Sequence, residues 1–302
     1  MRILITGANG QVGWELTRAF QTLGSVVALD RSELDLTLPG EVRARVLDMK
    51  PDLILNAAAY TAVDKAEDDE ATASLVNGDS VGAIAEVARR VGALVIHYST
   101  DYVFDGKKPN AYIESDVPNP LGAYGRTKLS GEQALQNSGA DYLCLRTSWV
   151  YAPRSRNFLR TMLRLAQTQS ELRLVADNRG APTSARLIAD ATADAVQVSM
   201  RERGSQQFSS GIFHLTASGE TSSYGFAQEI FRARNSLENA KGNSVPAIVP
   251  IRGSEYRARA SRPENSRMAC DAFVSRFGVT LPDWTVGVAL TIQEPGIASA
   301  DA

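Results

Sequence analysis

The stretch RILITGANGQVG, Arg2–Gly13, decides the fold. It opens with a run of apolar and β-branched residues that is typical of a buried strand. Gly7, Gly10 and Gly13 then predict a tight turn that reopens as a helix. A helix that begins after such a turn directs backbone N–H groups at one point, and a phosphate is the natural occupant of that point. The stretch therefore predicts a phosphate-binding turn between a strand and a helix.

Four more strand-like runs follow in the first 150 residues: SVVALD (25–30), DLILNAAA (52–59), ALVIHYST (93–100) and DYLCLRTSWV (141–150). Segments with helical spacing separate these runs. Strands that alternate with helices predict a parallel sheet with both faces covered. We therefore predict an α/β fold, a Rossmann-like doubly wound parallel sheet with a smaller C-terminal α/β substrate domain.

The first helix follows the glycine turn directly. Val12, Leu16, Phe20 and Leu23 recur at intervals of three and four residues, which places them on one helix face against the sheet. Gly24 is predicted as the C-terminal cap of this helix.

The regular alternation loosens after residue 150. Helices and strands are predicted there at 157–169, 172–177, 184–200, 211–216 and 222–234. We expect residues 1–150 to form the nucleotide-binding Rossmann domain, which also uses the helix near 184–200. Residues 151–302 are expected to form mainly a substrate-binding domain.

The composition argues against several classes of protein. The chain has 302 residues and 44% hydrophobic content, which is enough for a substantial core. Its net charge of −2 and its scattered Lys and Arg residues argue against a nucleic-acid partner. Its apolar runs are shorter than a bilayer crossing, and it begins with a strand instead of a signal segment. We therefore expect a cytoplasmic protein without a membrane partner.

The few cysteines and histidines narrow the chemistry further. Cys144 and Cys270 lie far apart in the sequence, and we expect neither a disulfide nor a catalytic thiol. His97 and His214 are the two histidines, and each lies within a strand-like run. The chain therefore offers few histidines for a zinc site or for Ser-His-Asp catalysis, and no metal site is predicted.

The residues that close the predicted strands are the ones to inspect, because ligands of a doubly wound sheet lie at the carboxyl ends of its strands. Asp30 closes the second strand, where an acidic side chain meets a ribose 2′-hydroxyl, which favours NADH. Arg31 follows it and can pair with the extra phosphate of NADPH. Both cofactors stay open, and a plain solvated turn is the alternative interpretation of DRSELD.

The third and fourth strands end in different kinds of residue. The third ends in NAAA, whose small side chains let a flat ring or a ribose approach the backbone. The fourth ends in YSTDYVF, which places the hydroxyl groups of Tyr98, Ser99, Thr100 and Tyr102 at the same edge of the sheet.

Tyr124 and Lys128, in AYGRTK, lie four residues apart at the start of a predicted helix and therefore share one helix face. A free phenol has a pKa of about 10, and a nearby ammonium lowers that value by stabilising the phenolate. We therefore predict that Lys128 makes Tyr124 a usable proton donor and acceptor, with Thr100 bonded to the same substrate oxygen. The alternative is a Tyr and a Lys that merely share a helix face.

The glycine turn, the Thr after the fourth strand and Tyr-x-x-x-Lys together resemble the extended short-chain dehydrogenase/reductase family. Longer segments are similar, in order, to those of the dTDP-4-dehydrorhamnose reductases: GANGQVGWEL, NAAAYTAVDKAE, HYSTDYVFDG, YGRTKLSGE, LRTSWVY, GAPTSA and ASRPENSR. These segments extend from the first residues to near position 270. The longer ones are much more specific than the three-glycine turn.

This resemblance implies an activity and a set of site residues. The family reduces the 4-keto group of a dTDP-linked 4-keto-6-deoxysugar with NADPH or NADH and forms dTDP-L-rhamnose. Tyr124, Lys128 and Thr100 are implied as catalytic residues, and Lys128 would also hold the nicotinamide ribose. Implied cofactor contacts are Gly7, Gly10, Gln11, Val12, Gly13, Asp30, Arg31, Asp35, Leu36, Ala59, Tyr60, Thr61, Tyr98 and Lys128. Implied substrate contacts are Thr100, Asp101, Tyr124, Trp149 and Arg262.

Two of these substrate contacts also have a physical rationale. Arg262 is a plausible clamp for a diphosphate, because a guanidinium pairs with phosphate through two hydrogen bonds. Trp149 closes the fifth strand, and its broad face can pack against the methyl side of a deoxysugar; core packing is the alternative.

Some relatives bind Mg²⁺ through glutamates at a subunit interface. Glu15 matches one such glutamate, whereas Arg186 replaces a second. The resemblance therefore leaves a metal-bridged dimer in doubt for this chain, and a homodimer stays an open possibility.

Two other functions stay open. The sugar nucleotide can differ, because residues outside the motifs select it. The same fold family also includes a non-catalytic regulatory subunit that partners methionine adenosyltransferase. A member of the fold family that has lost its enzymatic activity need not keep Thr100, Tyr124 and Lys128 together. The presence of all three therefore favours an enzyme.

Overall fold

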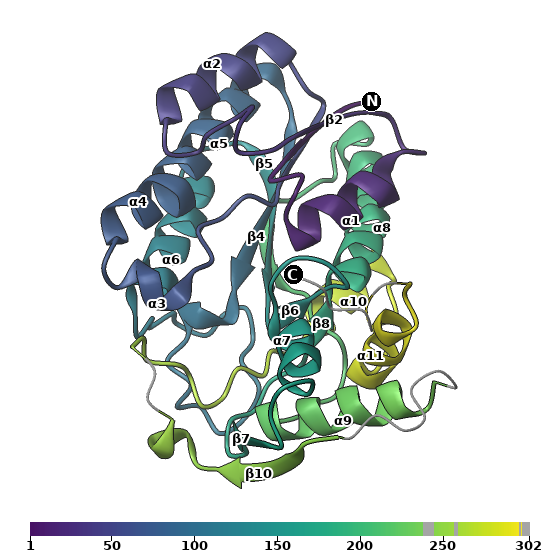
Figure 1. The fold of residues 1–302 in the computed structure, drawn as a ribbon. Coiled ribbons are helices and arrows are strands. Elements are labelled where there is room, and N and C mark those ends of the chain that lie inside the picture. Colours follow the sequence, from purple (N-terminus) through teal and green to yellow (C-terminus); the bar gives the residue numbers. More distant parts are fainter. Residues whose placement is uncertain (238–244, 257–258, 296, 298–302) are drawn as a thin grey trace.

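The computed structural model describes residues 1–237, 245–256, 259–295 and 297. A six-stranded parallel sheet with the order β2-β1-β3-β4-β5-β9 forms its centre (Figure 1). Its strands are β1 (Arg2–Thr6), β2 (Ser25–Leu29), β3 (Leu53–Asn56), β4 (Leu94–Thr100), β5 (Asp141–Thr147) and β9 (Gly211–His214). The predicted α/β fold with a doubly wound parallel sheet is confirmed.

Helices cover both faces of this sheet, as Figure 1 shows. On one face, α1 (Gln11–Phe20) packs against α8 (Ala185–Gly204). On the other face, α2 (Pro39–Met49), α5 (Ser80–Val91) and α6 (Ala123–Gln136) pack side by side. The first five strands thus gain a helical layer on each side.

Alternate residues of each strand enter different cores. Ile3 and Ile5 pack with the apolar residues of α1 and α8, whereas Leu4 packs with those of α2 and α5. All three side chains are buried. Because both faces of the sheet are covered, its central strands consist of continuous apolar runs instead of alternating apolar and polar residues.

The end of α1 differs from the prediction. The helix ends at Phe20, and a turn closed by a hydrogen bond from Leu23 N to Phe20 O leads into β2. The predicted cap at Gly24 is therefore wrong. The chain leaves the helix early because the N–H of Ser25 must reach the Met1 carbonyl, at 2.9 Å, to begin β2 beside β1.

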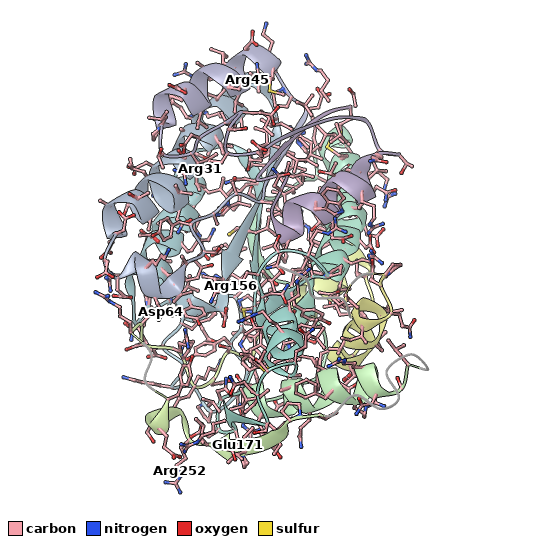
Figure 2. The ribbon with its side chains drawn as sticks, viewed as in Figure 1. Arg31, Arg45, Asp64, Arg156, Glu171 and Arg252 are labelled. Carbon is pink, nitrogen blue, oxygen red and sulfur yellow. The ribbon has the colours of Figure 1, made fainter. Side chains whose placement is uncertain are left out.

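A second part of the molecule lies beyond the carboxyl ends of the main sheet, in the lower half of Figure 1. It has a separate apolar core, which includes Tyr151, Leu159, Phe226 and Trp284. Its helices and small parallel sheets are α7 (Phe158–Leu165), α9 (Ser223–Asn235), α11 (Trp284–Ile292), β6 (Val150–Tyr151) with β8 (Thr183–Ser184), and β7 (Glu171–Val175) with β10 (Ala247–Ile251). Figure 2 shows Glu171 and Arg252 at the far end of this part. The division into 1–150 and 151–302 stays a prediction, and α8 and β9 are later segments that join the main sheet.

Shorter elements complete the described chain. These are α3 (Val63–Ala66), α4 (Glu70–Ser74), a π-helical turn (Leu75–Asp79), two 3-10 turns (Asp101–Val103 and Gly253–Glu255) and α10 (Asp271–Phe277). No helix in the described ranges is both long and apolar enough to cross a membrane. Cys144 and Cys270 are free thiols.

The glycine turn owes its shape to a close backbone approach. Gly7 has a positive φ of 70°, and Gly10 N–H donates to the Gly7 carbonyl at 2.9 Å. A Cβ on Gly13 would lie 2.1 Å from that carbonyl oxygen. Only a residue without a side chain allows α1 to begin at this distance from the turn.

We predict that Gly13→Ala destabilises the protein by about 1–3 kcal/mol, because the added methyl group overlaps the Gly7 carbonyl. Gly40→Ala is the matched control: a Cβ there meets nothing within 4 Å, and this residue lies in α2. Urea unfolding followed by circular dichroism measures both free energies. Equal unfolding free energies for the two variants would contradict the packing argument.

Candidate active site

The predicted site residues gather at the carboxyl edge of the sheet. The strand order reverses direction between β1 and β3, and ligands of doubly wound sheets bind at this switch point. The loops after these two strands touch there, because a Cβ on Gly7 would lie 2.8 Å from the Ala58 nitrogen. The site therefore begins where the glycine turn meets the loop after β3.

The start of α1 presents backbone donors at this edge. Gln11, Val12 and Gly13 form its first turn, and the N-cap residue Gly10 has no side chain to bond to their N–H groups. Such a helix start favours an anion such as a phosphate. The Gln11 amide oxygen also accepts a hydrogen bond of 2.9 Å from Asn157, which ties the loop before α7 to the turn.

Asp30 is held as an oriented carboxylate after β2. The Ser32 backbone and hydroxyl groups donate to Oδ1 at 2.8 and 2.6 Å, and Asn9 donates to Oδ2 at 2.6 Å. These hydrogen bonds, those from Ser32 above all, lower the pKa of Asp30. The Arg31 side chain is 78% exposed, and its Nε lies 3.3 Å from Asp35 Oδ2. An acceptor for a ribose hydroxyl thus stands next to a cation that can pair with a phosphate.

The other predicted cofactor residues lie in the loop after β3 or in the apolar core. Tyr60 is held through its backbone, because the Asn77 side chain bonds to both its N–H and its carbonyl group at 2.9 and 3.2 Å. Ala59 and Thr61 flank it in the same loop after β3. Leu36 is buried in the apolar core, and only its carbonyl is engaged, by Ser80 Oγ at 2.6 Å.

Tyr98 differs from the other predicted contacts. It is buried, and its hydroxyl donates to Thr192 on α8 at 3.0 Å, so its side chain points into the core. Its carbonyl instead accepts a hydrogen bond of 2.6 Å from Lys128 Nζ. The structure therefore brings the backbone of Tyr98, but not its hydroxyl, to the predicted catalytic residues.

The three predicted catalytic residues come from the end of β4 and the first turns of α6. The first N–H of α6, at Ala123, donates to the Glu67 carboxylate at 2.8 Å, and this contact fixes the helix start. Tyr124 is half-buried beside Tyr102, whose ring centroid lies 5.4 Å away. The Thr100 hydroxyl lies close enough to the Tyr124 phenol to oppose a rise in its pKa. The structure thus brings Thr100 and Tyr124 together.

In this structure the pKa of Tyr124 is shifted upward, opposite to the direction predicted from Lys128. Burial raises the pKa of Tyr124, and the contact with Thr100 opposes the rise only in part. The Lys128 ammonium is directed at other groups, because it is bonded to the Tyr98 carbonyl at 2.6 Å and lies 3.3 Å from His97 Nε2. Tyr124 is therefore a neutral phenol near pH 7, which is the form that donates a proton.

Lys128 is itself strongly perturbed by burial. Its side chain is only 1% exposed. Burial lowers its pKa to about 8, against the opposing charge of Glu132. Its charge therefore changes within the range of pH in which enzymes are commonly assayed.

Asp101 lies behind Thr100. It is 2% exposed and accepts a hydrogen bond of 3.0 Å from the Thr100 hydroxyl. Its Oδ2 has no hydrogen-bond partner in the described part of the chain. Burial raises the pKa of Asp101 to about 6, against the contacts with Ser266 and Thr100.

β5 ends at Thr147, before its predicted end at residue 150, and Trp149 follows it. Its φ of 47° lies in the left-handed region, which a bulky residue rarely adopts and which is often associated with function. Its ring lies against Gly180, where a Cβ would come within 2.5 Å of the indole. It also packs against the core of the second part, so the packing alternative holds for part of its surface.

Arg262 lies on the other side of the site. Its guanidinium forms an ion pair with Asp64 at 3.0 Å and lies over the Tyr256 ring. Figure 2 shows Asp64 on α3. The pair therefore joins the segment around Arg262 to α3.

Sequence reasoning missed several buried polar residues of the site. Asn56 closes β3, His97 lies within β4, and Asn77 organises the loop after β3. The detectable signal was a polar residue inside an apolar run, as in LILN and LVIHY, because a buried polar group needs a specific partner. Glu67 gave no such signal, since its contact with α6 depends on the tertiary fold.

Comparison with known proteins shows the family of the chain. Residues 1–296 match the family described as RmlD substrate binding domain. A dTDP-4-dehydrorhamnose reductase from Burkholderia thailandensis is 52% identical over 97% of this chain and 99% of its own length.

Solved structures give the same result. A dTDP-4-dehydrorhamnose reductase from Clostridium acetobutylicum has a TM-score of 0.85 at 34% identity, over 97% of this chain and 98% of its own. Another, from Bacillus anthracis in complex with NADP, has a TM-score of 0.83 at 31% identity, over 96% of this chain and 98% of its own. The chain therefore belongs to the family of the dTDP-4-dehydrorhamnose reductases.

Proposed function

We propose that this protein reduces the 4-keto group of dTDP-4-dehydrorhamnose to give dTDP-L-rhamnose, with NADPH or NADH as the reductant. The names of its relatives support the substrate and the reaction. The observation that carries the proposal is the gathering of Thr100, Tyr124 and Lys128 where β4 ends and α6 begins.

Tyr124 is the proposed proton donor. When bound, the nicotinamide cofactor supplies a hydride to the keto carbon. The resulting sugar alkoxide is a stronger base than a phenolate, so it takes the proton from Tyr124 even though burial raises the pKa of this phenol. Thr100 orients the phenol and the same substrate oxygen. General acid catalysis of this kind contributes about a hundredfold to ten-thousandfold in rate.

The remaining residues bind the two ligands in this proposal. Lys128 holds the nicotinamide ribose, the start of α1 binds the cofactor diphosphate, and Asp30 or Arg31 meets the adenosine ribose. Trp149 and Asp101 contact the sugar, and Arg262 clamps the diphosphate of the substrate. We also propose a cytoplasmic location, and a homodimer as the assembly to test by sedimentation.

A Mg²⁺ ion at Glu15, as in some relatives, does not fit this chain. Arg186 lies between two carboxylates, with Nε 3.4 Å from Glu15 Oε2 and Nη2 2.5 Å from Glu294 Oε1. Arg18 also pairs with Glu15 Oε2 at 2.8 Å. Of the two carboxylate oxygens of Glu15, Oε1 is the one that lacks a hydrogen-bond partner in the described part of the chain. Two guanidinium groups already neutralise the acids and repel a cation.

We predict that Tyr124→Phe lowers turnover about a hundredfold to ten-thousandfold, because no other group delivers the proton, while cofactor affinity is kept. Loss of absorbance from the reduced cofactor measures turnover, and fluorescence titration measures affinity. Tyr142→Phe is the matched control, because Tyr142 lies at the amino end of β5, whereas the site lies at the carboxyl end of the sheet. Near-normal turnover of the Tyr124 variant would refute its role.

A second prediction concerns the sugar nucleotide. The protein is expected to turn over dTDP-4-dehydrorhamnose with either reduced cofactor and to release dTDP-L-rhamnose, identified by mass spectrometry and NMR. UDP- and GDP-linked 4-ketosugars are the comparison substrates. Preference for one of them would reassign the substrate, and no turnover of any ketosugar would favour a regulatory subunit.

A third prediction concerns metal. Because Arg186 occupies the space between Glu15 and Glu294, dialysis against EDTA is expected to leave both turnover and the sedimentation coefficient unchanged. Added Mg²⁺ is expected to have no effect beyond that of ionic strength. Loss of activity that Mg²⁺ alone restores would contradict this interpretation.

A further inference from the structure

A chain of buried polar side chains crosses the carboxyl ends of three neighbouring strands. Thr6 Oγ1 lies 2.7 Å from Asn56 Oδ1, and Asn56 Nδ2 lies 3.0 Å from His97 Nδ1. The other ring nitrogen, Nε2, lies 3.3 Å from Lys128 Nζ. The chain thus begins at the last residue of β1, beside the glycine turn, and ends at the proposed catalytic lysine.

All four side chains of this chain are withdrawn from solvent. None of them is more than 1% exposed. A buried donor or acceptor without a partner costs about 1–3 kcal/mol. Each group must therefore be satisfied by protein atoms, which are its neighbours in the chain and, at the two ends, the Ala58 N–H on Thr6 Oγ1 and the Tyr98 carbonyl on Lys128. The direction of one hydrogen bond thus restricts the direction of the next.

The charge of Lys128 sets that direction. An ammonium only donates, so His97 Nε2 must then accept, and the ring proton must lie on Nδ1. Asn56 must then offer its oxygen to His97 and its NH₂ group to Thr6. A neutral Lys128 has a lone pair and can instead accept from Nε2–H, with the Asn56 NH₂ group then donating to Nδ1, which is the amide orientation in the structure.

We propose that His97 is a positioning residue for Lys128: its Nε2 accepts a hydrogen bond from the ammonium and holds that charge at the end of β4. Through Asn56 and Thr6, His97 also couples the charge of Lys128 to the turn after β1. The inference rests on the proposed function, in which Lys128 holds the cofactor ribose.

The other groups around Lys128 are weaker candidates for this role. Glu132, on α6, is already paired with Arg146 through two hydrogen bonds of 2.9 and 2.7 Å. Cys144, on β5, is a neutral thiol, because burial raises its pKa. The Tyr98 carbonyl accepts one hydrogen bond from Lys128. His97 is then the neighbouring side chain that can accept a second one.

A pH dependence follows from this arrangement. Burial and the charge of Lys128 lower the pKa of His97 well below its usual value, so the ring stays neutral and able to accept. Burial also lowers the pKa of Lys128 to about 8. Loss of the His97 acceptor destabilises the ammonium and lowers this pKa further. Cofactor binding that requires the ammonium is then lost at a lower pH.

The test compares two amides at position 97. The longer side chain of His97→Gln can place its oxygen near the position of Nε2, whereas the shorter one of His97→Asn reaches only the Asn56 side. The midpoint of Lys128 titration is read by NMR of side-chain-labelled lysine, which is simple because the chain has six lysines. Lys128→Met identifies the signal, and NADPH affinity is measured against pH by fluorescence.

We expect His97→Asn to lower the Lys128 midpoint by about one pH unit and to shift the alkaline loss of NADPH affinity equally. His97→Gln is expected to keep both near the wild-type values. An unchanged midpoint in His97→Asn, or equal shifts in both variants, would overturn the proposal. Thermal unfolding of each variant separates these results from loss of fold.

A measurement on the unmodified protein covers the case in which a variant does not fold. The chain has two histidines, so ¹⁵N NMR resolves the His97 ring. We expect the ring proton on Nδ1 below the Lys128 midpoint, where the ammonium donates to Nε2. A ring proton on Nε2 below that midpoint would overturn the proposal. These readouts need no turnover, so failure of the proposed reaction would be distinguishable from failure of this inference.

Discussion

The Lys128 ammonium is buried where parallel strands end, and there it must be stabilised by protein atoms instead of water. Its side chain is 1% exposed, and its nearest partners are the Tyr98 carbonyl and the His97 ring. Removing a charge from water is costly unless hydrogen bonds replace the lost solvation. The spacing between β4 and α6, and therefore the position of Tyr124 one helical turn away, depends on this requirement.

The same burial gives the neighbouring groups different tasks. The Tyr124 phenol stays neutral because its charged form is poorly solvated, and a reductase needs a neutral acid at this point. Asp101, behind Thr100, is also pushed toward its neutral form, although its pKa of about 6 leaves it charged near pH 7. Thr100 contacts both groups and therefore joins the proton donor to a buried carboxylate.

Much of this arrangement could be predicted from the sequence, because it depends on local patterns. Continuous apolar runs predicted the buried strands, the glycine spacing predicted the turn, and the four-residue spacing placed Tyr124 and Lys128 on one helix face. The early end of α1 was missed, because the pairing of β2 with β1 fixes it and the local sequence does not.

The electrostatics of the site could not be predicted in this way. The sequence shows that a lysine follows Tyr124, but not that its ammonium is bonded to the carbonyl of the strand beneath. The direction of the Tyr124 pKa shift depends on how deeply the phenol is buried, which is a property of the tertiary fold. Asn56 and His97 were visible only as polar residues in apolar runs, and their partners come from other strands and from α6.

A crystal structure of the protein with NADPH tests the central claim most directly. The account predicts that Lys128 Nζ lies within hydrogen-bond distance of the nicotinamide ribose and that the nicotinamide ring faces Thr100 and Tyr124. A nicotinamide ribose bound away from Lys128, with the ring turned from Tyr124, would contradict it.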